Sequence, residues 1–289
     1  MDRIERRIRR QHLPRLNGRR WTDSLAGLVV PLLALAVWQW VASHGWVNPQ
    51  LLPAPLAVWN KWVDYLLPLA PYAGAGRDGW FRWAMSGELP RDIAASLYRV
   101  AVGFVLGAGL ALPLGLAMGT SRIVHAWMNP LVQVLRPIPP IAYIPLAILW
   151  FGLGDPPAVF LIALGAFFPV LMNTVAGVRQ VDGIYLRAAR NLGAGRVTMF
   201  VRVILPAAMP YILAGVRIGI GTAFIVVIVS EMIAVNDGLG YRILEAREYF
   251  WSDKIIAGMI SIGLLGLAID FGMSRLTRYL LRWHRGLEQ

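Results

Sequence analysis

Four ionisable side chains lie near the ends of long apolar stretches of the sequence, where a charge is costly unless it is paired or faces water. Arg99 begins one stretch and Glu231 ends another, and at ~1.5 Å per helical residue both lie near one face of a membrane. The same count places Arg217 and Asp270 near the opposite face. We therefore predict structural ion pairs, with Arg99 paired to Glu231; direct contact with a solute is the alternative.

A fifth charged residue, Arg136, precedes a proline cluster inside another apolar stretch. Pro137, Pro139 and Pro140 remove backbone donors in quick succession, and Pro145 follows, so a regular helix is expected to break here. A broken helix survives in a bilayer only where it is buried in protein or lines a water-filled cavity. A structural kink and part of a translocation path both remain open. The residues that we assign to such a path are Arg136, Pro137, Pro139, Pro140 and Glu231.

Motifs of enzymatic chemistry are missing from the sequence. A P-loop needs a lysine after a glycine, but the two lysines, Lys61 and Lys254, follow Asn60 and Asp253. The four histidines stand apart and form no H-E-x-x-H motif, and there are no cysteines to ligate a metal. We expect no cofactor in this chain, so the energy for any transport comes from another chain or from an ion gradient.

The composition is that of an integral membrane protein. Of the 289 residues, 57% are hydrophobic and 15% are charged, and the mean hydropathy is +0.56. A membrane-spanning helix needs roughly 20 apolar residues, and six stretches are long enough. We predict an all-α fold, a domain of six transmembrane helices over 24–289 that follows a basic arm at 1–23. The six stretches cover about 24–43, 93–119, 128–152, 156–177, 210–235 and 255–275.

Lysine and arginine are distributed unevenly between the segments that join these stretches. If the N-terminus is cytoplasmic, the inner segments contain 18 of them and the outer segments seven. Cytoplasmic loops favour these residues, so both ends of the chain are predicted to lie inside. The arm at 1–23 acts as a topology signal or lies on anionic membrane lipid. Because the basic residues collect between apolar stretches, the net charge of +12 does not indicate nucleic acid as a partner.

Two further patterns concern how helices pack. Gly103-x3-Gly107 and Gly215-x3-Gly219 place small residues one turn apart inside predicted spans, where they allow helices to approach closely. In the outer segment 44–92, Trp59, Trp62, Val63 and Leu66 recur at helical spacing after a stiff Leu52–Pro55 turn, and a loop follows at 74–79. This spacing predicts an amphipathic helix on the outer membrane interface.

The basic inner segment 178–209 carries the most informative spacing. Ala188 and Ala189 give a short helix a smooth face for a partner, and Gly193 can adopt the positive φ that often ends a helix. Pro206 then favours a new helix start before the fifth span. The face formed by Ala188 and Ala189 can seat in the groove of a partner.

This segment resembles the EAA loop of ABC importer permeases, written E-A-A-x3-G-x9-I-x-L-P. Ala188, Ala189, Gly193, Leu205 and Pro206 match that pattern, while Arg187 replaces the glutamate and Val203 replaces the isoleucine. Other stretches resemble the permeases of the taurine, aliphatic sulfonate and nitrate group, and taurine permeases most closely. They include 135–140, 148–152, 177–179, 215–219, 238–241, 246–250 and 282–284.

The resemblance implies a type I importer permease in the bacterial inner membrane that is not itself an enzyme. Its expected partners are a second copy of the permease, two cytoplasmic ATPase subunits that bind ATP and Mg, and a periplasmic solute-binding protein. In the family, the loop helix docks into a cleft of the ATPase, and the transport path follows the dimer interface. The resemblance thus implies a docking element in 178–209 that is formed by Arg187, Ala188, Ala189, Leu192, Gly193, Leu205 and Pro206. Arg187 in place of glutamate removes a carboxylate-specific contact and leaves the docking expected. The implied substrate is a small oxyanion, with taurine or another sulfonate first and nitrate second.

Two other classes of membrane protein need features that the sequence does not show. A gradient-driven secondary transporter needs internal inverted repeats and an ion site at the midplane, and the sequence shows no clear repeat. A membrane-embedded enzyme needs clustered His, Asp or Glu side chains within the spans, and none is evident. A permease of the same family for another small organic solute remains the main alternative for the substrate.

Overall fold

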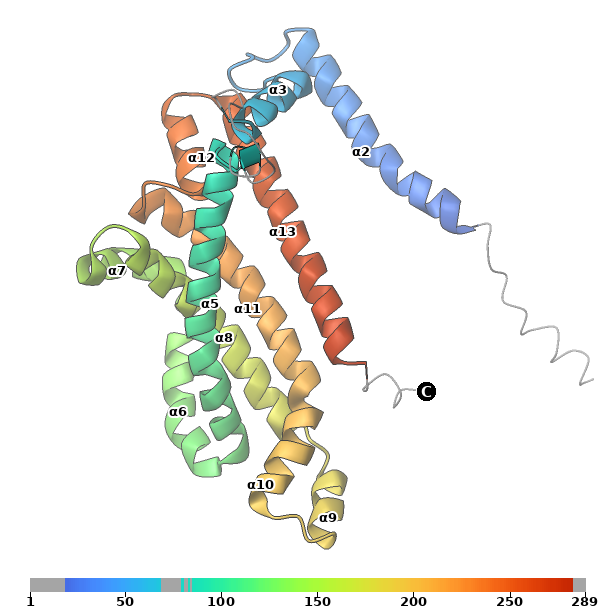
Figure 1. Cartoon of the computed structure of the whole chain (residues 1–289), viewed down its shortest axis with the longest axis vertical. Helices are drawn as coiled ribbons and strands as arrows, with labels where there is room; N and C mark the ends of the chain where they lie inside the picture. Colours follow the sequence, from blue (N-terminus) through green and yellow to red (C-terminus); the bar gives the residue numbers. More distant parts are fainter. Residues whose placement is uncertain (1–18, 69–78, 81–82, 84, 283–289) are drawn as a thin grey trace, which may run out of the picture. The chain divides into compact units, whose positions relative to one another are not determined.

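The computed structural model of the chain describes residues 19–68, 79, 80, 83 and 85–282, and all of the regular secondary structure in them is helical (Figure 1). The basic arm lies outside these residues up to position 18, and so does the predicted loop at 74–79 except for Gly79. The all-α class predicted from the sequence is confirmed for the described part of the chain.

The chain divides into two compact units, residues 1–59 and 60–289. The first contains α2 (Arg19–Ser43), and within this unit the Trp38 indole donates a hydrogen bond to the Pro53 carbonyl at 3.1 Å. Helix α3 (Pro55–Leu66) crosses from the first unit to the second. Pro55 is its first residue, a position where the missing backbone N–H breaks no helix hydrogen bond. The helix predicted in this segment is therefore present.

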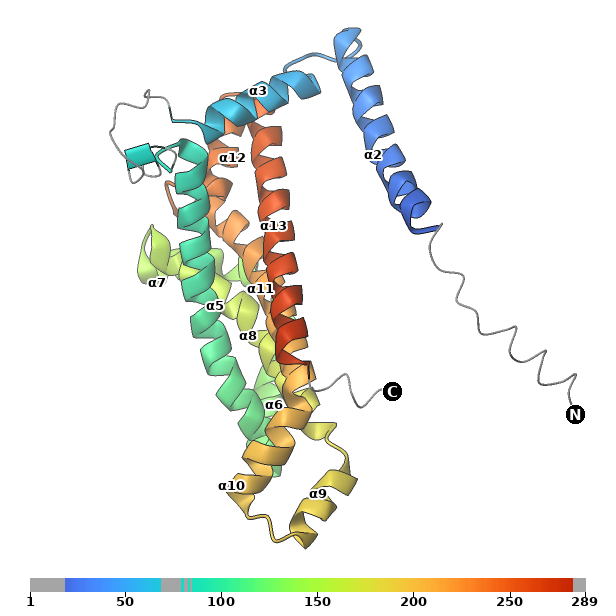
Figure 2. The same cartoon turned by 45° about the vertical axis from the view of Figure 1, so that its right-hand side comes forward.

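Three long helices form the core of the second unit, and α8 is the central one (Figures 1 and 2). α8 (Asp155–Arg179) packs along its length against α5 (Glu88–Thr120) on one side and α11 (Leu205–Ala234) on another. Its inward-facing side chains are small or branched and buried, so the three helices pack closely together. α12 (Leu239–Glu248) and α13 (Ser252–Leu280) complete this unit after α11.

Glycines allow the close approach of these three helices. A Cβ built on Gly107 of α5 would lie 2.2 Å from the Ala163 carbonyl oxygen of α8. On the other side of α8, a Cβ on Gly215 would meet the Asn173 Cβ at 2.6 Å, and one on Gly219 would meet Val170 at 2.9 Å. The packing role predicted for the two glycine pairs is therefore confirmed. The glycines allow the backbones of α5 and α11 to lie directly against α8.

Adding one methyl group at Gly107 is expected to lower the free energy of unfolding by about 1–3 kcal/mol, because a backbone carbonyl must move to admit it. Gly109 lies on the same helix with no atom within 4 Å of its Cβ position. The matched variant Gly109→Ala should be neutral or stabilise by up to about 1 kcal/mol. Detergent-mixed-micelle unfolding measures both, and equal effects would show that α5 and α8 are not in close contact.

The predicted spans fall on described helices, although their number stays a prediction. Four described helices are long and apolar enough to cross a membrane, or five if one bent pair counts as a single span. The predicted first span falls on α2, whose described apolar part, 29–43, is shorter than these. The four helices are α5, α8, α13 and the helical run 196–234 that contains α11.

The bent pair coincides with the proline cluster. Helix α6 (Arg122–Leu135) ends before Arg136, and the chain resumes as the 3₁₀ turn η1 (Pro140–Tyr143) and helix α7 (Ile144–Phe151). The two arms are bent by 82°. The break predicted from the missing backbone donors is therefore confirmed.

Pro206 stands in the first turn of α11, as predicted, but no break in the helical run precedes it. Helix α10 (Arg196–Met199) continues through the π-helical turn η2 (Phe200–Ile204) into α11 without interruption. The Leu205 N–H bonds the Phe200 carbonyl, five residues back, and the widened turn leaves room for the proline ring that follows. A π turn relieves the clash that would otherwise break the helix.

Candidate functional site

The docking element predicted in segment 178–209 forms a short helix between α8 and α10. Helix α9 (Gly183–Asn191) starts at Asp182, whose carboxylate accepts the Ile184 N–H at 2.8 Å. In Figures 1 and 2 α9 and α10 lie at the opposite end of the second unit from α12. The loop is therefore anchored by the ends of two core helices and projects away from them.

The end of α9 is a glycine turn. Gly193 has φ = 77°, and its N–H bonds the Arg190 carbonyl at 2.9 Å. The Ala194 N–H bonds the Ala189 carbonyl at 3.0 Å, which gives the paired hydrogen bonds of a Schellman-type cap. The positive φ predicted for Gly193 is confirmed, and this turn sends the chain back toward α10.

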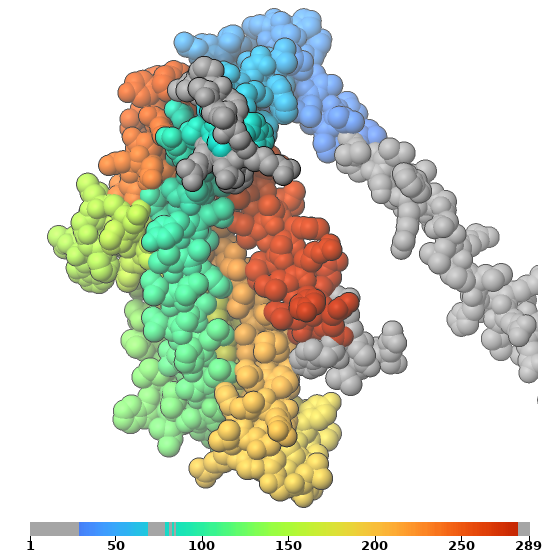
Figure 3. Space-filling model, viewed as in Figure 1, coloured from blue at the N-terminus to red at the C-terminus, as the bar shows by residue number. Residues whose placement is uncertain are grey.

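The surface of the loop is apolar and open. Leu192 is 87% exposed, and Ile184, Tyr185 and Val197 are also mostly exposed. Figure 3 shows this loop, in yellow, as the tip of the second unit. Exposed apolar side chains gathered on one projecting loop mark an interaction surface. Arg187 and Ala188 are exposed, and Ala189 is half-buried on the same short helix.

Two residues assigned to the docking element lie away from its tip. Leu205 packs beside the buried cluster of Val178, Ala208 and Ile212, and Pro206 is half-buried next to it. Both lie at the base of α11 rather than on the exposed surface. The structure therefore groups Arg187–Gly193 at the tip and places Leu205 and Pro206 where they support it.

The assigned path residues are separated by the structure. Arg136, Pro137 and Pro139 are exposed at the break, and Pro140 is half-buried. Within the described residues the Arg136 guanidinium forms no ion pair, which leaves its charge available to a solute or to another chain. Glu231 lies elsewhere, 0% exposed, and this burial favours the structural role that the sequence left open.

Glu231 belongs to an ion cluster centred on Arg99. The Arg99 guanidinium is 4% exposed and donates to Glu231 at 2.9 Å and to Asp155 at 2.6 Å, and it also pairs with Asp237. The predicted ion pair between Arg99 and Glu231 is confirmed. Arg99 thereby connects α5 to the start of α8, the end of α11 and the loop after it, which fixes four segments around one charge.

Carboxylate oxygens of Glu231 and Asp92 also accept backbone N–H groups at the start of α12. The Glu231 carboxylate accepts from the Ser96 hydroxyl and the Gly240 N–H, both at 2.9 Å. Asp92, one turn before Ser96, accepts the Gly238 N–H at 3.0 Å and the Tyr65 hydroxyl at 2.8 Å. Burial, reinforced by the Asp92 charge, raises the pKa of Tyr65, so the phenol stays neutral and keeps donating.

The second predicted charge pair is also present. Arg217 on α11 and Asp270 on α13 form a bidentate contact, in which Nε and Nη2 of Arg217 each donate to a carboxylate oxygen of Asp270 at 2.9 Å. Both side chains are about half exposed within this chain. Among the described residues, no group of His, Cys, Asp and Glu has the arrangement of a metal site.

Four residues of the ion clusters were missed by sequence reasoning. Asp92, Asp155 and Asp237 come from three segments far apart in the chain, and Arg242 pairs with Asp92 at 2.9 Å. The three acids share one signal in the sequence, because each stands just outside an apolar stretch on the face where Arg99 and Glu231 are predicted to lie. Acidic residues that directly flank the predicted spans at the membrane face of Arg99 are therefore candidate partners for it, in addition to acids inside the spans.

Comparisons with known proteins identify the family. Residues 109–286 match the family model described as "Binding-protein-dependent transport system inner membrane component". An aliphatic sulfonates transport permease protein of Bacillus subtilis (SsuC) is 36% identical, with 94% of this chain and 92% of the relative covered. The taurine transport system permease protein TauC of Escherichia coli is 36% identical, with 92% and 91% covered.

The fold agrees with solved structures of such transporters. An inward-facing structure of the MetNI methionine ABC transporter contains a chain that matches with a TM-score of 0.58 and 20% identity, over 66% of this chain and 95% of that one. The chain therefore belongs to the binding-protein-dependent transport system inner membrane component family, as a multi-pass inner-membrane permease of the taurine and sulfonate group of ABC importers.

Proposed function

We propose that this chain forms the membrane path of an importer for a small oxyanion, with taurine or another sulfonate as the first candidate and nitrate as the second. The work of ATP hydrolysis belongs to two separate ATPase subunits that bind ATP and Mg. The observation that supports coupling between the ATPases and transport is the α9 tip. It is an apolar surface on a glycine-capped helix with the spacing of the EAA loop.

The proposed assembly contains two copies of the permease and a periplasmic solute-binding protein. Arg187, Ala188, Ala189, Leu192 and Gly193 are the proposed ATPase contacts, supported from behind by Leu205 and Pro206. In this proposal both ends of the chain lie in the cytoplasm, and the domain 24–289 crosses the membrane six times after the arm at 1–23. Closure of the ATPases then pulls the two α9 helices together and changes which side of the membrane the path faces.

The proposed path runs past the break at Arg136. An anion that crosses between apolar helices needs hydrogen-bond donors or positive potential, and the Arg136 guanidinium, which forms no ion pair with the described residues, provides both. The prolines keep this segment out of a regular helix, so its backbone also presents free polar groups. A path residue of an importer needs only weak affinity for its solute, because the binding protein selects it.

Replacing Arg136 by glutamine is expected to slow sulfonate uptake by roughly 10- to 150-fold, because a charge-assisted contact is typically worth about 1.5–3 kcal/mol. The measurement is uptake of radiolabelled taurine and nitrate by vesicles that contain the permease, its ATPase and its binding protein. Arg122→Gln, at the other end of α6, is the matched control and should leave uptake unchanged.

The result that contradicts the anion proposal has two forms. Equal uptake by Arg136→Gln and the unmutated chain would make Arg136 structural. Uptake of a neutral organic solute, with neither taurine nor nitrate transported, would make the substrate assignment wrong while leaving the importer proposal intact.

A further inference from the structure

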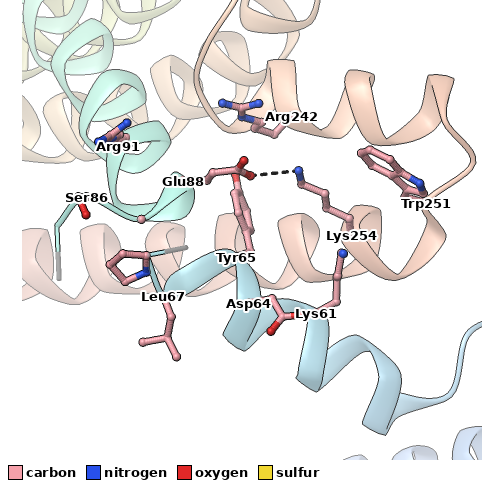
Figure 4. Close-up of a pocket in the computed structure, with 12 residues that line it drawn as sticks. Lys61, Asp64, Tyr65, Leu67, Ser86, Glu88, Arg91, Arg242, Trp251 and Lys254 are labelled. Carbon is pink, nitrogen blue, oxygen red and sulfur yellow. Dashed lines mark hydrogen bonds and ion pairs between the residues drawn. The ribbon is translucent and has the colours of Figure 1, made fainter. Parts of the chain in front are cut away.

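A cavity of about 970 Å³ lies at the end of the second unit opposite α9 (Figure 4). Its walls come from residues 61–68, at the end of α3 and just after it, from the start of α5, and from α12 and the start of α13. The Trp62 indole donates to the Ser261 hydroxyl at 2.8 Å, and Tyr65 donates to Asp92, so this half of α3 is fixed to the bundle. These two hydrogen bonds hold the α3 wall of the cavity in place against the rest of the second unit.

The cavity wall contains more basic than acidic side chains. Lys61, Arg91, Arg242 and Lys254 line it, against Asp64 and Glu88. Lys254 pairs with Glu88 at 3.1 Å, and Arg242 pairs with Asp92 behind the wall.

Lys61 and Arg91 form no ion pair within the described part of the chain. In Figure 4 Lys61 projects from α3 toward Lys254, while Asp64 projects from the same helix away from both. Glu88 already neutralises Lys254, so the ammonium group of Lys61 is the one on this side of the wall that has no carboxylate partner among the described residues, and Arg91 is a second such cation beyond Glu88.

The position of the cavity restricts what that anion can be. α5 and α13 are two of the long apolar helices, and both begin at the cavity, so the cavity lies at the depth of lipid headgroups. Tyr65 and Trp251 line it, and such amphipathic rings favour this depth. Below it, α13 exposes apolar side chains, among them Met259, Leu264 and Leu267, on which acyl chains can pack.

We propose that this cavity binds the headgroup of an anionic membrane phospholipid, with Lys61 as the contact to its phosphate and Arg91, further along the wall beyond Glu88, as a second basic contact to the headgroup. The phosphate neutralises Lys61, and the apolar wall accepts the glycerol and the first part of the acyl chains. A bound lipid would hold α3 against the starts of α5 and α13. The proposal concerns lipid and does not depend on which solute the permease transports.

The experiment uses the full chain, delipidated in detergent, and titrates it with phosphatidylglycerol while native mass spectrometry counts bound lipid. Each of Lys61→Gln and Arg91→Gln should weaken binding about fivefold, as expected for one basic residue at a membrane surface. Asp64→Asn should strengthen it, because an acidic group is lost from the rim. Arg247→Gln, an exposed arginine of α12 that does not line the cavity, should change nothing.

Two outcomes would overturn the proposal. If Arg247→Gln weakens binding as much as Lys61→Gln does, the lipid is held by the general charge of this end. If glycerol phosphate or inorganic phosphate displaces the lipid at equal concentration, the cavity binds a free phosphate and not a lipid. Because binding is read without transport, a failure here is distinct from a failure of the importer proposal.

Discussion

Replacing Gly193 by tryptophan is expected to abolish ATP-driven transport and association with the ATPase, while the protein still inserts into the membrane. Gly193 has a positive φ that side chains rarely adopt, and its Cβ position is open, so the change alters the α9 tip and does not disturb a core. Strain of about 1–2 kcal/mol and a large ring would displace Leu192 from the docking surface. Co-purification with the ATPase measures the effect.

The matched control for this prediction is Gly45→Trp. Gly45 also has a positive φ and open space around its Cβ position, but it follows α2 and lies far from the loop in sequence. It carries the same backbone strain, so it separates strain from loss of docking. Normal transport by Gly193→Trp, or equal loss in both variants, would remove α9 as the main contact with the ATPase.

Arg99→Met is expected to lower the free energy of unfolding by about 3–5 kcal/mol, the cost of leaving a buried charge unpaired. Glu231 is fully buried and depends on Arg99 for its only cationic partner in the described residues. Unfolding in mixed micelles measures the loss. Arg247→Met, an exposed arginine on α12, should change the free energy by less than about 0.5 kcal/mol.

The double variant Arg99→Met/Glu231→Met tests the cause. Removing both charges removes the unpaired carboxylate, so a large part of the lost stability should return. If the double variant is as unstable as Arg99→Met, the cluster stabilises the unit through Asp155 and Asp237 instead of through Glu231.

The sequence predicts the helices and their order because membrane spans carry strong signals in length and hydropathy. It also predicts the Arg99–Glu231 pair, since an isolated charge in a span needs a partner at its own depth. The break after Leu135 follows from the backbone N–H groups that the prolines lack. The turn at Gly193 follows because helices commonly end on a glycine with positive φ. These are local rules, and the structure obeys them.

Features that depend on tertiary contacts were not predictable in the same way. Asp155 and Asp237 meet at Arg99 only because α5, α8 and α11 pack together, and no local spacing encodes that meeting. The start of α11 at Pro206 follows from the sequence, but the π turn that joins α11 to α10 without a break does not. The cavity beside Lys61 is likewise invisible in the sequence, because its walls come from four separate segments.

The most direct test of the central claim is the energy source of uptake in vesicles of defined composition. We expect taurine uptake only when the permease, an ATPase subunit with ATP and the binding protein are all present, and we expect it to persist after ionophores collapse the proton and sodium gradients. Uptake by the permease alone that follows an ion gradient and ignores ATP would contradict the account.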